Sequence, residues 1–179
     1  KTMREKILQA IRKNEIQTYS VTEKTTEGAE LYFIKKDLDM RRMKKDAYSE
    51  VTIYRDFEVD GKKMRGSADI NIFPEMTQEE VDKAISGAFY AASFVKNPYF
   101  EIPKGKKEDK VEVESTLCGK SLEEIGDAFV KALYCVDVHE DAFINTAEFF
   151  MDKTWTAIYN SGRFCAKCHS SLCITDSGL

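Results

Sequence analysis

The chain has 179 residues, of which 42% are hydrophobic and 32% charged, the composition of an ordinary globular domain and not of a disordered segment. A formal net charge of −4 argues against a nucleic-acid binder held by bulk positive charge. No apolar run approaches the ~20 residues of a membrane helix, and no signal-peptide core follows the N-terminus. We therefore expect a cytoplasmic protein. Its five cysteines, an odd number, do not form a disulfide framework.

The first third of the chain predicts one helix and then strands. Apolar residues at helical spacing predict a short helix over residues 3–13. The Thr-rich segment 16–27 fits either a strand or a loop. Residues 30–36 are apolar on both faces, which indicates a strand covered on both sides or a strand at an interface. Residues 38–48 favour a basic strand.

A β-hairpin over residues 51–71 is the most sharply defined element. Asp60-Gly61 is a two-residue turn signal that tolerates positive φ at both positions. With this turn, apolar side chains of both arms fall on one face, and polar side chains fall on the other. A slip of one residue would turn every side chain over, so turn and pattern agree on one register. Phe57 then faces Met64, Ile53 faces Ala68, and Val51 faces Ile70.

A long helix is predicted to follow the hairpin and to cover its apolar face. Thr77 and Glu80 form a capping-box pattern, and Asn97-Pro98 ends the segment. A stripe at helical spacing includes Phe89 as a predicted core residue and runs on to Val95.

The pattern restarts after a linker over residues 99–110. Ser121 and Glu124 form a second capping box, followed by a second amphipathic stripe over residues 122–136. Residues 143–151 and 154–159 then fit a second hairpin around Asp152-Lys153. The predicted fold class is α/β, a two-layer sandwich with a mostly antiparallel sheet and the helices packed on one face.

The tail carries the motif that most suggests a metal. Cys-x-x-Cys-His is the attachment pattern of c-type haem, but haem attachment belongs to exported proteins and nothing here signals export. A tetrahedral zinc site is the second possibility, although two of its ligands would be adjacent in sequence. A disordered or artefactual tail is the third. The residues concerned are Cys165, Cys168, His169 and Cys173.

Two other groups fit either a function or plain surface chemistry. His139-Glu140-Asp141 has one histidine where a helical zinc-peptidase motif needs two, so a solvated helix end explains it. A basic group on residues 41–55 could contact a phosphate, a peptide or an acidic partner, or it could be a solvated strand face. The contact residues expected here are Arg41, Arg42, Tyr54 and Arg55. No catalytic residue is evident.

Four strings resemble the N-terminal region of the TldD/PmbA family, first described as modulators of DNA gyrase and regarded as metallopeptidases. They are residues 30–41, 51–57, 62–67 and 91–99. Two departures stand beside this resemblance. The His-Glu-x-x-x-His motif of the family's zinc subunit has no match in this chain. After Tyr159-Asn160-Ser161-Gly162, where the family continues with a strand, residues 163–179 lose strand alternation.

The resemblance implies three parts: a family-like α/β domain over residues 1–97, the start of a middle domain over residues 98–162, and an atypical tail over residues 163–179. It implies a module that forms the substrate chamber and subunit contacts of a zinc metallopeptidase, with no cofactor in this chain and zinc elsewhere in the full-length enzyme. The expected partners are a peptide or unfolded protein substrate and a second or paralogous subunit, with no nucleic acid and no membrane. The alternative is a non-catalytic binding or assembly domain that uses an exposed sheet face.

Two outcomes are expected if the family-like sequence ends where the tail begins. Residues 143–159 would form an unpaired apolar edge. Either a second copy of the chain would then pair with this edge, or the tail would fold back over it.

Overall fold

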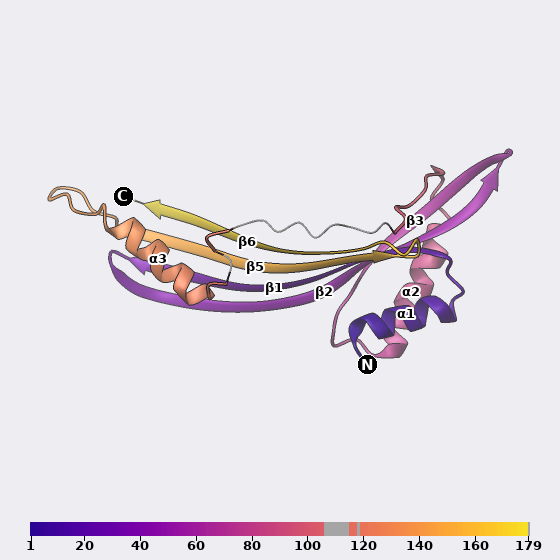
Figure 1. The fold of residues 1–179 in the computed structure, drawn as a ribbon, viewed down its shortest axis with the longest axis horizontal. Coiled ribbons are helices and arrows are strands. Elements are labelled where there is room, and N and C mark those ends of the chain that lie inside the picture. Colours follow the sequence, from indigo (N-terminus) through magenta and orange to yellow (C-terminus); the bar gives the residue numbers. More distant parts are fainter. Residues whose placement is uncertain (106–114, 118, 179) are drawn as a thin grey trace. The chain divides into compact units, whose positions relative to one another are not determined.

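The computed structural model describes residues 1–105, 115–117 and 119–178, with side chains described as far as residue 170. Three helices and six strands form this part of the chain (Figure 1). Among these residues no helix is long and apolar enough to cross a membrane. In chain order the elements are α1 (Met3–Lys13), β1 (Thr18–Ile34), β2 (Asp37–Val59), β3 (Lys62–Ile72), α2 (Gln78–Ala92), β4 (Asn97–Pro98), α3 (Leu122–Tyr134), β5 (Thr146–Asn160) and β6 (Cys165–Gly178).

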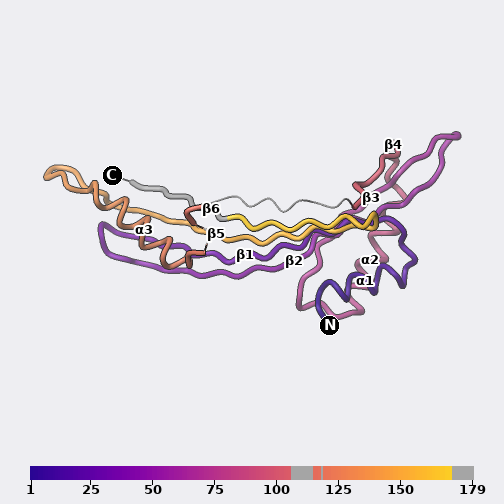
Figure 2. The backbone as a smooth tube through the Cα atoms, viewed as in Figure 1, coloured from indigo at the N-terminus to yellow at the C-terminus, as the bar shows by residue number. Residues whose placement is uncertain are grey.

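The strands form one sheet in the order β4-β3-β2-β1-β5-β6, which confirms the predicted α/β class with a mainly antiparallel sheet. Figure 2 shows how β2 turns directly into β3. The predicted hairpin register is confirmed, since Phe57 pairs with Met64, as do Ile53 with Ala68 and Val51 with Ile70. Asp60 and Gly61 have φ values of 50° and 72°, the left-handed pair that such a turn requires.

All three helices begin with a capping box, in which a hydroxyl and a glutamate three residues later satisfy each other's backbone N–H groups. This confirms the predicted starts at Thr77 and Ser121. The predicted extension of α2 to Val95 is wrong. The helix ends at Ala92 because the next N–H groups bond three residues back, Ser93 to Tyr90 and Phe94 to Ala91, which closes the last turn.

Two strands are longer than the sequence pattern indicated. Residues 16–27 and 30–36 contribute mainly to the single strand β1, and residues 38–48 lie in β2. The predicted second hairpin around Asp152-Lys153 is wrong, because β5 runs without a break through both residues. Their polar side chains are satisfied on neighbouring segments: Asp152 lies 3.2 Å from the Lys44 ammonium, and Lys153 donates to the Lys120 carbonyl.

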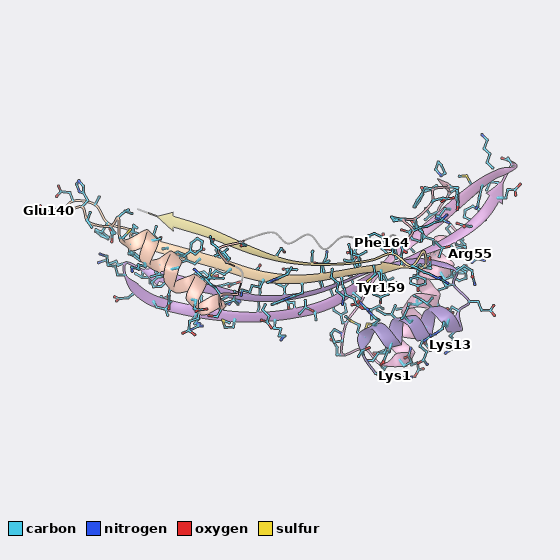
Figure 3. All side chains as sticks on the ribbon, viewed as in Figure 1. Lys1, Lys13, Arg55, Glu140, Tyr159 and Phe164 are labelled. Atoms are coloured by element: carbon cyan, nitrogen blue, oxygen red, sulfur yellow. The ribbon has the colours of Figure 1, made fainter. Side chains whose placement is uncertain are left out.

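The tail also forms a strand. Asn160 and Phe164 exchange hydrogen bonds across a tight turn, in which Arg163 has a φ of 62°, and β6 then lies beside β5 (Figure 3 labels Tyr159 and Phe164 here). The structure therefore has the second of the two expected outcomes for this edge, in which the tail folds back over β5. At residues 165–178 the structure has a strand and not the disordered tail that was expected.

The chain divides into two compact units, each made of three segments. Unit 1 comprises Lys1–Lys24, Ala47–Glu108 and Thr156–Cys168, and unit 2 comprises Thr25–Asp46, Asp109–Trp155 and His169–Leu179. The divisions at residues 97 and 162 that the family resemblance implies stay predictions. Residues 106–110 of the predicted linker lie outside the described part of the chain.

In unit 1, α1 and α2 pack against each other and cover one face of the hairpin. Val51, Ile53 and Ile72 are fully buried there, as are Ile7 of α1 and Ile85 of α2. Phe89, predicted as a core anchor, is only partly buried at the margin of this cluster. Its ring packs under the Arg55 guanidinium, which lies 4.8 Å from the ring centre.

In unit 2, α3 packs on β1 and β5. Phe33, Phe149 and Tyr134 meet edge to face, with ring centres 5.8 Å apart in each contact. Ile125 and Met151 form a second cluster with Ala29. Unit 1 thus has two helices, and unit 2 has one described helix, on one face of its own strands, as the two-layer prediction requires.

Candidate functional site

The face of the hairpin opposite α1 and α2 carries the polar groups of unit 1. We call this surface the open face; it comprises Tyr48, Glu50, Thr52, Tyr54 and Asp56 of β2 and Arg65, Ser67, Asp69 and Asn71 of β3. The register explains why these residues share a face, since side chains alternate along each strand and the two arms are paired residue by residue.

Arg65 is the most constrained polar side chain on this face, with 4% of its surface exposed. It lies directly opposite Asp56 in the hairpin. Its Nε and Nη2 donate to the two Asp56 oxygens at 2.7 and 2.9 Å, and Nη1 donates to the Phe100 carbonyl at 2.6 Å. A two-pronged pair of this kind is among the stronger charged hydrogen bonds.

The Arg65 pair has electrostatic consequences for both partners. Its hydrogen bonds hold the pKa of the Asp56 carboxyl below the ordinary value, and Asp56 in turn raises the pKa of Arg65. The guanidinium also lies 4.4 Å from the Tyr99 ring centre, close to Tyr54 and Phe100. Each of the three guanidinium nitrogens donates a hydrogen bond, and through the Phe100 carbonyl Arg65 attaches the segment after β4 to the sheet.

A hollow of about 440 Å³ lies farther along the open face. Carboxylates from both strands line it together with aromatic side chains: Tyr48, Glu50, Asp69, Ile70, Asn71 and Phe73. Asp69 accepts a hydrogen bond from Thr52 at 2.6 Å, and Glu50 lies 3.9 Å from Lys24. Two carboxylates beside aromatic rings suit a cationic side chain, by charge pairing and by cation–π contact.

The structure separates the predicted contact residues. Tyr54 is on the open face, where burial and then the Asp69 charge raise its pKa, and its ring meets Phe100 at 5.8 Å. Arg55, the next residue, is on the opposite face, where its guanidinium lies over the Phe89 ring. Arg41 is exposed and Arg42 lies 3.6 Å from Glu30, both in unit 2. The predicted contact role of these four residues stays a prediction.

The tail motif lies along β6. Cys165 and Cys168 are both exposed free thiols, and residues three apart in a strand point to opposite faces about 10 Å apart. The His169 ring stacks on Trp155, with ring centres 4.8 Å apart and an interplanar angle of 2°. The side chain of Cys173 lies outside the described residues. Among the described residues no three His, Cys, Asp or Glu side chains are grouped as a metal would need.

Arg65 and Asp56 were missed as a pair although the register already placed them opposite each other. The signal was present, since opposite charges at one cross-strand position stabilise a hairpin. His139 and Glu140 lie at an exposed chain segment after α3, where the His139 ring accepts a hydrogen bond from the Asp141 backbone.

Comparison with solved structures gives the fold. A crystal structure of a candidate DNA gyrase modulator from Thermotoga maritima matches 98% of this chain with a TM-score of 0.67 and 16% identity. The chain has the fold of part of this Thermotoga protein. TldE from Thermococcus kodakarensis matches 95% of the chain (TM-score 0.64, 15% identity), and a candidate DNA gyrase modulator from Bacteroides thetaiotaomicron matches 97% (TM-score 0.68, 11% identity).

The matches cover nearly all of this chain but only part of the other proteins. The chain spans 38% of the Thermotoga and Thermococcus proteins and 39% of the Bacteroides protein. No family model matches the sequence, and no curated protein matches it. The resemblance seen in the sequence is thus confirmed at the level of the fold.

Proposed function

We propose that this chain is the N-terminal module of a TldD/PmbA-like metallopeptidase of the cytoplasm, and that it forms walls of a substrate chamber and contacts between subunits. The observation that carries the proposal is the end-to-end fold match, which covers 98% of this chain and only 38% of the Thermotoga protein. The sequence strings that resemble the family support the same assignment.

The proposal gives this chain no part in the bond-breaking step. The zinc of the family enzyme does not fit the described residues, because they contain no group of three metal-ligating side chains. His139 is exposed, and its one hydrogen bond links it to the neighbouring backbone. Under this proposal the functional surfaces contact other polypeptides, namely the peptide substrate and a second or paralogous subunit.

The peptidase assignment is tested with the purified chain, casein as substrate, and elemental analysis for zinc. We expect no cleavage and no zinc in stoichiometric amount. His139→Ala and Glu140→Ala, as a matched pair, should leave this result unchanged. Metal-dependent cleavage that His139→Ala abolishes and Glu140→Ala does not would overturn the proposal and place a catalytic site in the chain itself.

A second candidate function is a protein-binding domain that works through the open face, and the hollow beside Glu50 and Asp69 favours it. Such a domain should bind a peptide with a central arginine, and binding should weaken in Glu50→Gln and Asp69→Asn. Ser67→Ala, on the same face but outside the lining of the hollow, is the control. Titration calorimetry that shows no binding, or equal binding by all variants, would exclude this function.

A further inference from the structure

A small pocket lies beside Arg65 in unit 1, where three segments that are far apart in the sequence meet. They are the start of β1, the segment after β4 and the turn after β5. The volume of the pocket is about 180 Å³, which corresponds to about six water molecules at ~30 Å³ each. Polar and charged side chains dominate its lining, which includes Thr18, Arg65, Tyr99, Glu101, Lys104 and Ser161.

Hydrogen bonds between the three segments hold the walls of this pocket in place. The Ser161 N–H donates to the Tyr19 carbonyl at 3.1 Å, and the Tyr19 N–H donates to the Ser161 hydroxyl at 3.2 Å. The Gly105 N–H donates to the Gly162 carbonyl at 2.9 Å. Gly162 also lies so close to the segment after β4 that an added methyl group would come within 2.7 Å of the Pro103 carbonyl oxygen. The pocket is therefore formed in advance, and a ligand can enter it without the cost of ordering a loop.

Arg65 brings unused hydrogen-bond donors to the pocket. Only 4% of its surface is exposed. A guanidinium has five N–H groups, and three of those of Arg65 donate to Asp56 and to the Phe100 carbonyl. The other two, one on each terminal nitrogen, have no acceptor in hydrogen-bond geometry within the described part of the chain. A buried charged donor is stabilised when it gains an acceptor, so the pocket favours a ligand that carries oxygen atoms.

The charges around the pocket favour an anion with a single charge. Lys104 lies 3.1 Å from Glu101, but the two side chains are 73% and 67% exposed. An ion pair this exposed contributes little to stability, so Lys104 can turn to a ligand at small cost. A further cation, Lys63, lies over the Tyr99 ring at 3.6 Å from its centre. The charged groups are three cations and two carboxylates, a net charge of about +1: Lys63, Arg65, Lys104, Asp56 and Glu101.

We propose that this pocket binds a small carboxylate, whose oxygen atoms accept from the two unused N–H groups of Arg65 and from the Lys104 ammonium. A carboxylate matches the planar guanidinium and balances the single net charge. An anion with two charges, such as phosphate, would leave an excess of negative charge, and a neutral amide would leave the positive charge unbalanced. This inference does not depend on the proposed peptidase module.

The test is a titration of the full chain in which amide NMR chemical shifts report binding and its location. N-acetylglycine is the probe, and N-acetylglycinamide is its control, because it replaces only the carboxylate by a neutral amide. The same carboxylate group occurs in free acids and at the C-terminus of a peptide. N-acetyl-triglycine presents it at the end of a peptide and so distinguishes these two sources.

Three variants assign the binding to named side chains. Arg65→Lys keeps a positive charge opposite Asp56 but loses the fork of donors. Lys104→Gln removes the cation at the mouth of the pocket. Lys62→Gln is its matched control, because it removes an exposed lysine three residues before Arg65, on the opposite face of β3. Lys104 is exposed, so its replacement leaves the fold intact, and the test does not depend on the folding of Arg65→Lys.

We expect N-acetylglycine to shift the amides of residues 99–104 and 161–162 saturably, with a dissociation constant of about 1 mM. This constant should rise about tenfold or more in Arg65→Lys, which loses charged hydrogen bonds, and about threefold in Lys104→Gln. Equal binding of N-acetyl-triglycine assigns the pocket to peptide ends, and binding of N-acetylglycine alone assigns it to free acids.

Four results would overturn the proposal. They are the absence of saturable shifts, equal binding of N-acetylglycinamide, an Arg65→Lys protein that binds like the parent, and a Lys104→Gln protein that binds no more weakly than Lys62→Gln. The last result would reduce the effect to the general charge of the surface.

Discussion

Gly66 offers the sharpest test of how the helix and the hairpin fit together. It lies inside β3, where replacing glycine by alanine ordinarily stabilises a protein by about 0.5–1 kcal/mol. Here a methyl group would overlap the Ala92 carbonyl oxygen and would come within 2.7 Å of the Val95 carbonyl oxygen. The obstacle is backbone at the end of α2, and Ala92 is itself fully buried. The helix end must therefore move for Gly66→Ala to fold.

We expect Gly66→Ala to lower the free energy of unfolding by about 3 kcal/mol, the upper part of the range for an overfilled core. Gly87→Ala is the matched control within α2, since its methyl group meets nothing within 4 Å. It should raise the free energy of unfolding by about 0.5–1 kcal/mol through helix propensity. The two substitutions are chemically the same and should have opposite signs.

The measurement is a urea titration followed by far-ultraviolet circular dichroism, together with amide hydrogen exchange of α2. Exchange near Ala92 should accelerate in Gly66→Ala, because the added methyl group loosens the end of α2 locally. It should slow in Gly87→Ala, because alanine has the higher helix propensity. A Gly66→Ala protein within about 0.5 kcal/mol of the parent, an effect typical of surface positions, would refute the close approach of α2 to β3.

Three further outcomes are expected. Phe89→Ala should cost about 1–2 kcal/mol in a urea titration, less than the ~3–5 kcal/mol of a fully buried ring, because Phe89 is only partly buried; a cost above ~3 kcal/mol would place it in the core. Arg65 keeps the pKa of Asp56 below its ordinary value of 3.8, so the pair's contribution to stability is present above that pH and is lost as the pH falls through the folded pKa. Arg65→Met should therefore flatten the acid limb of stability against pH, and an unchanged acid limb would contradict the pairing. Removal of residues 163–179 should uncover the β5 edge and produce concentration-dependent association by light scattering, whereas a chain that stays unassociated would show that β6 does not protect this edge.

The hairpin could be predicted in detail because its determinants are local. A left-handed turn at Asp60-Gly61 and an alternating pattern on each arm agree on one register, and the structure has that register. The helix starts were predictable for the same reason, since a capping box needs only four consecutive residues. The end of α2 was not, because apolar residues continue past Ala92 without helical backbone.

The long strands depended on contacts that the local sequence does not contain. Asp152-Lys153 has the polarity of a turn, yet both residues lie inside β5, where Lys44 and the Lys120 carbonyl satisfy them. Thr154 similarly shares a hydrogen bond with Thr26 of β1 at 3.1 Å. These partners are far away along the chain, so polarity alone indicated a loop where the fold has a strand.

The tail shows the same limitation for a candidate site. Cys165 and Cys168 suggested a metal because their spacing suits a loop or helix turn that brings two thiols together. In β6 the same spacing sends them to opposite faces. An exposed sheet face was predicted as a binding surface, but its hollow and its Arg65–Asp56 pair were not, because their members come from two strands and combine only through the register.

Two consecutive residues of β3 each position a neighbouring segment, one on each face of the hairpin. Gly66 admits the end of α2 on one face, and Arg65 holds the segment after β4 on the other through Asp56 and the Phe100 carbonyl. Because side chains alternate along a strand, one register sets both contacts, and a slip of one residue would exchange them. The buried guanidinium would then meet the helix, and the position that requires glycine would face the open surface. The turn at Asp60-Gly61 therefore determines the helix packing on one face of the hairpin and the composition of the open face on the other.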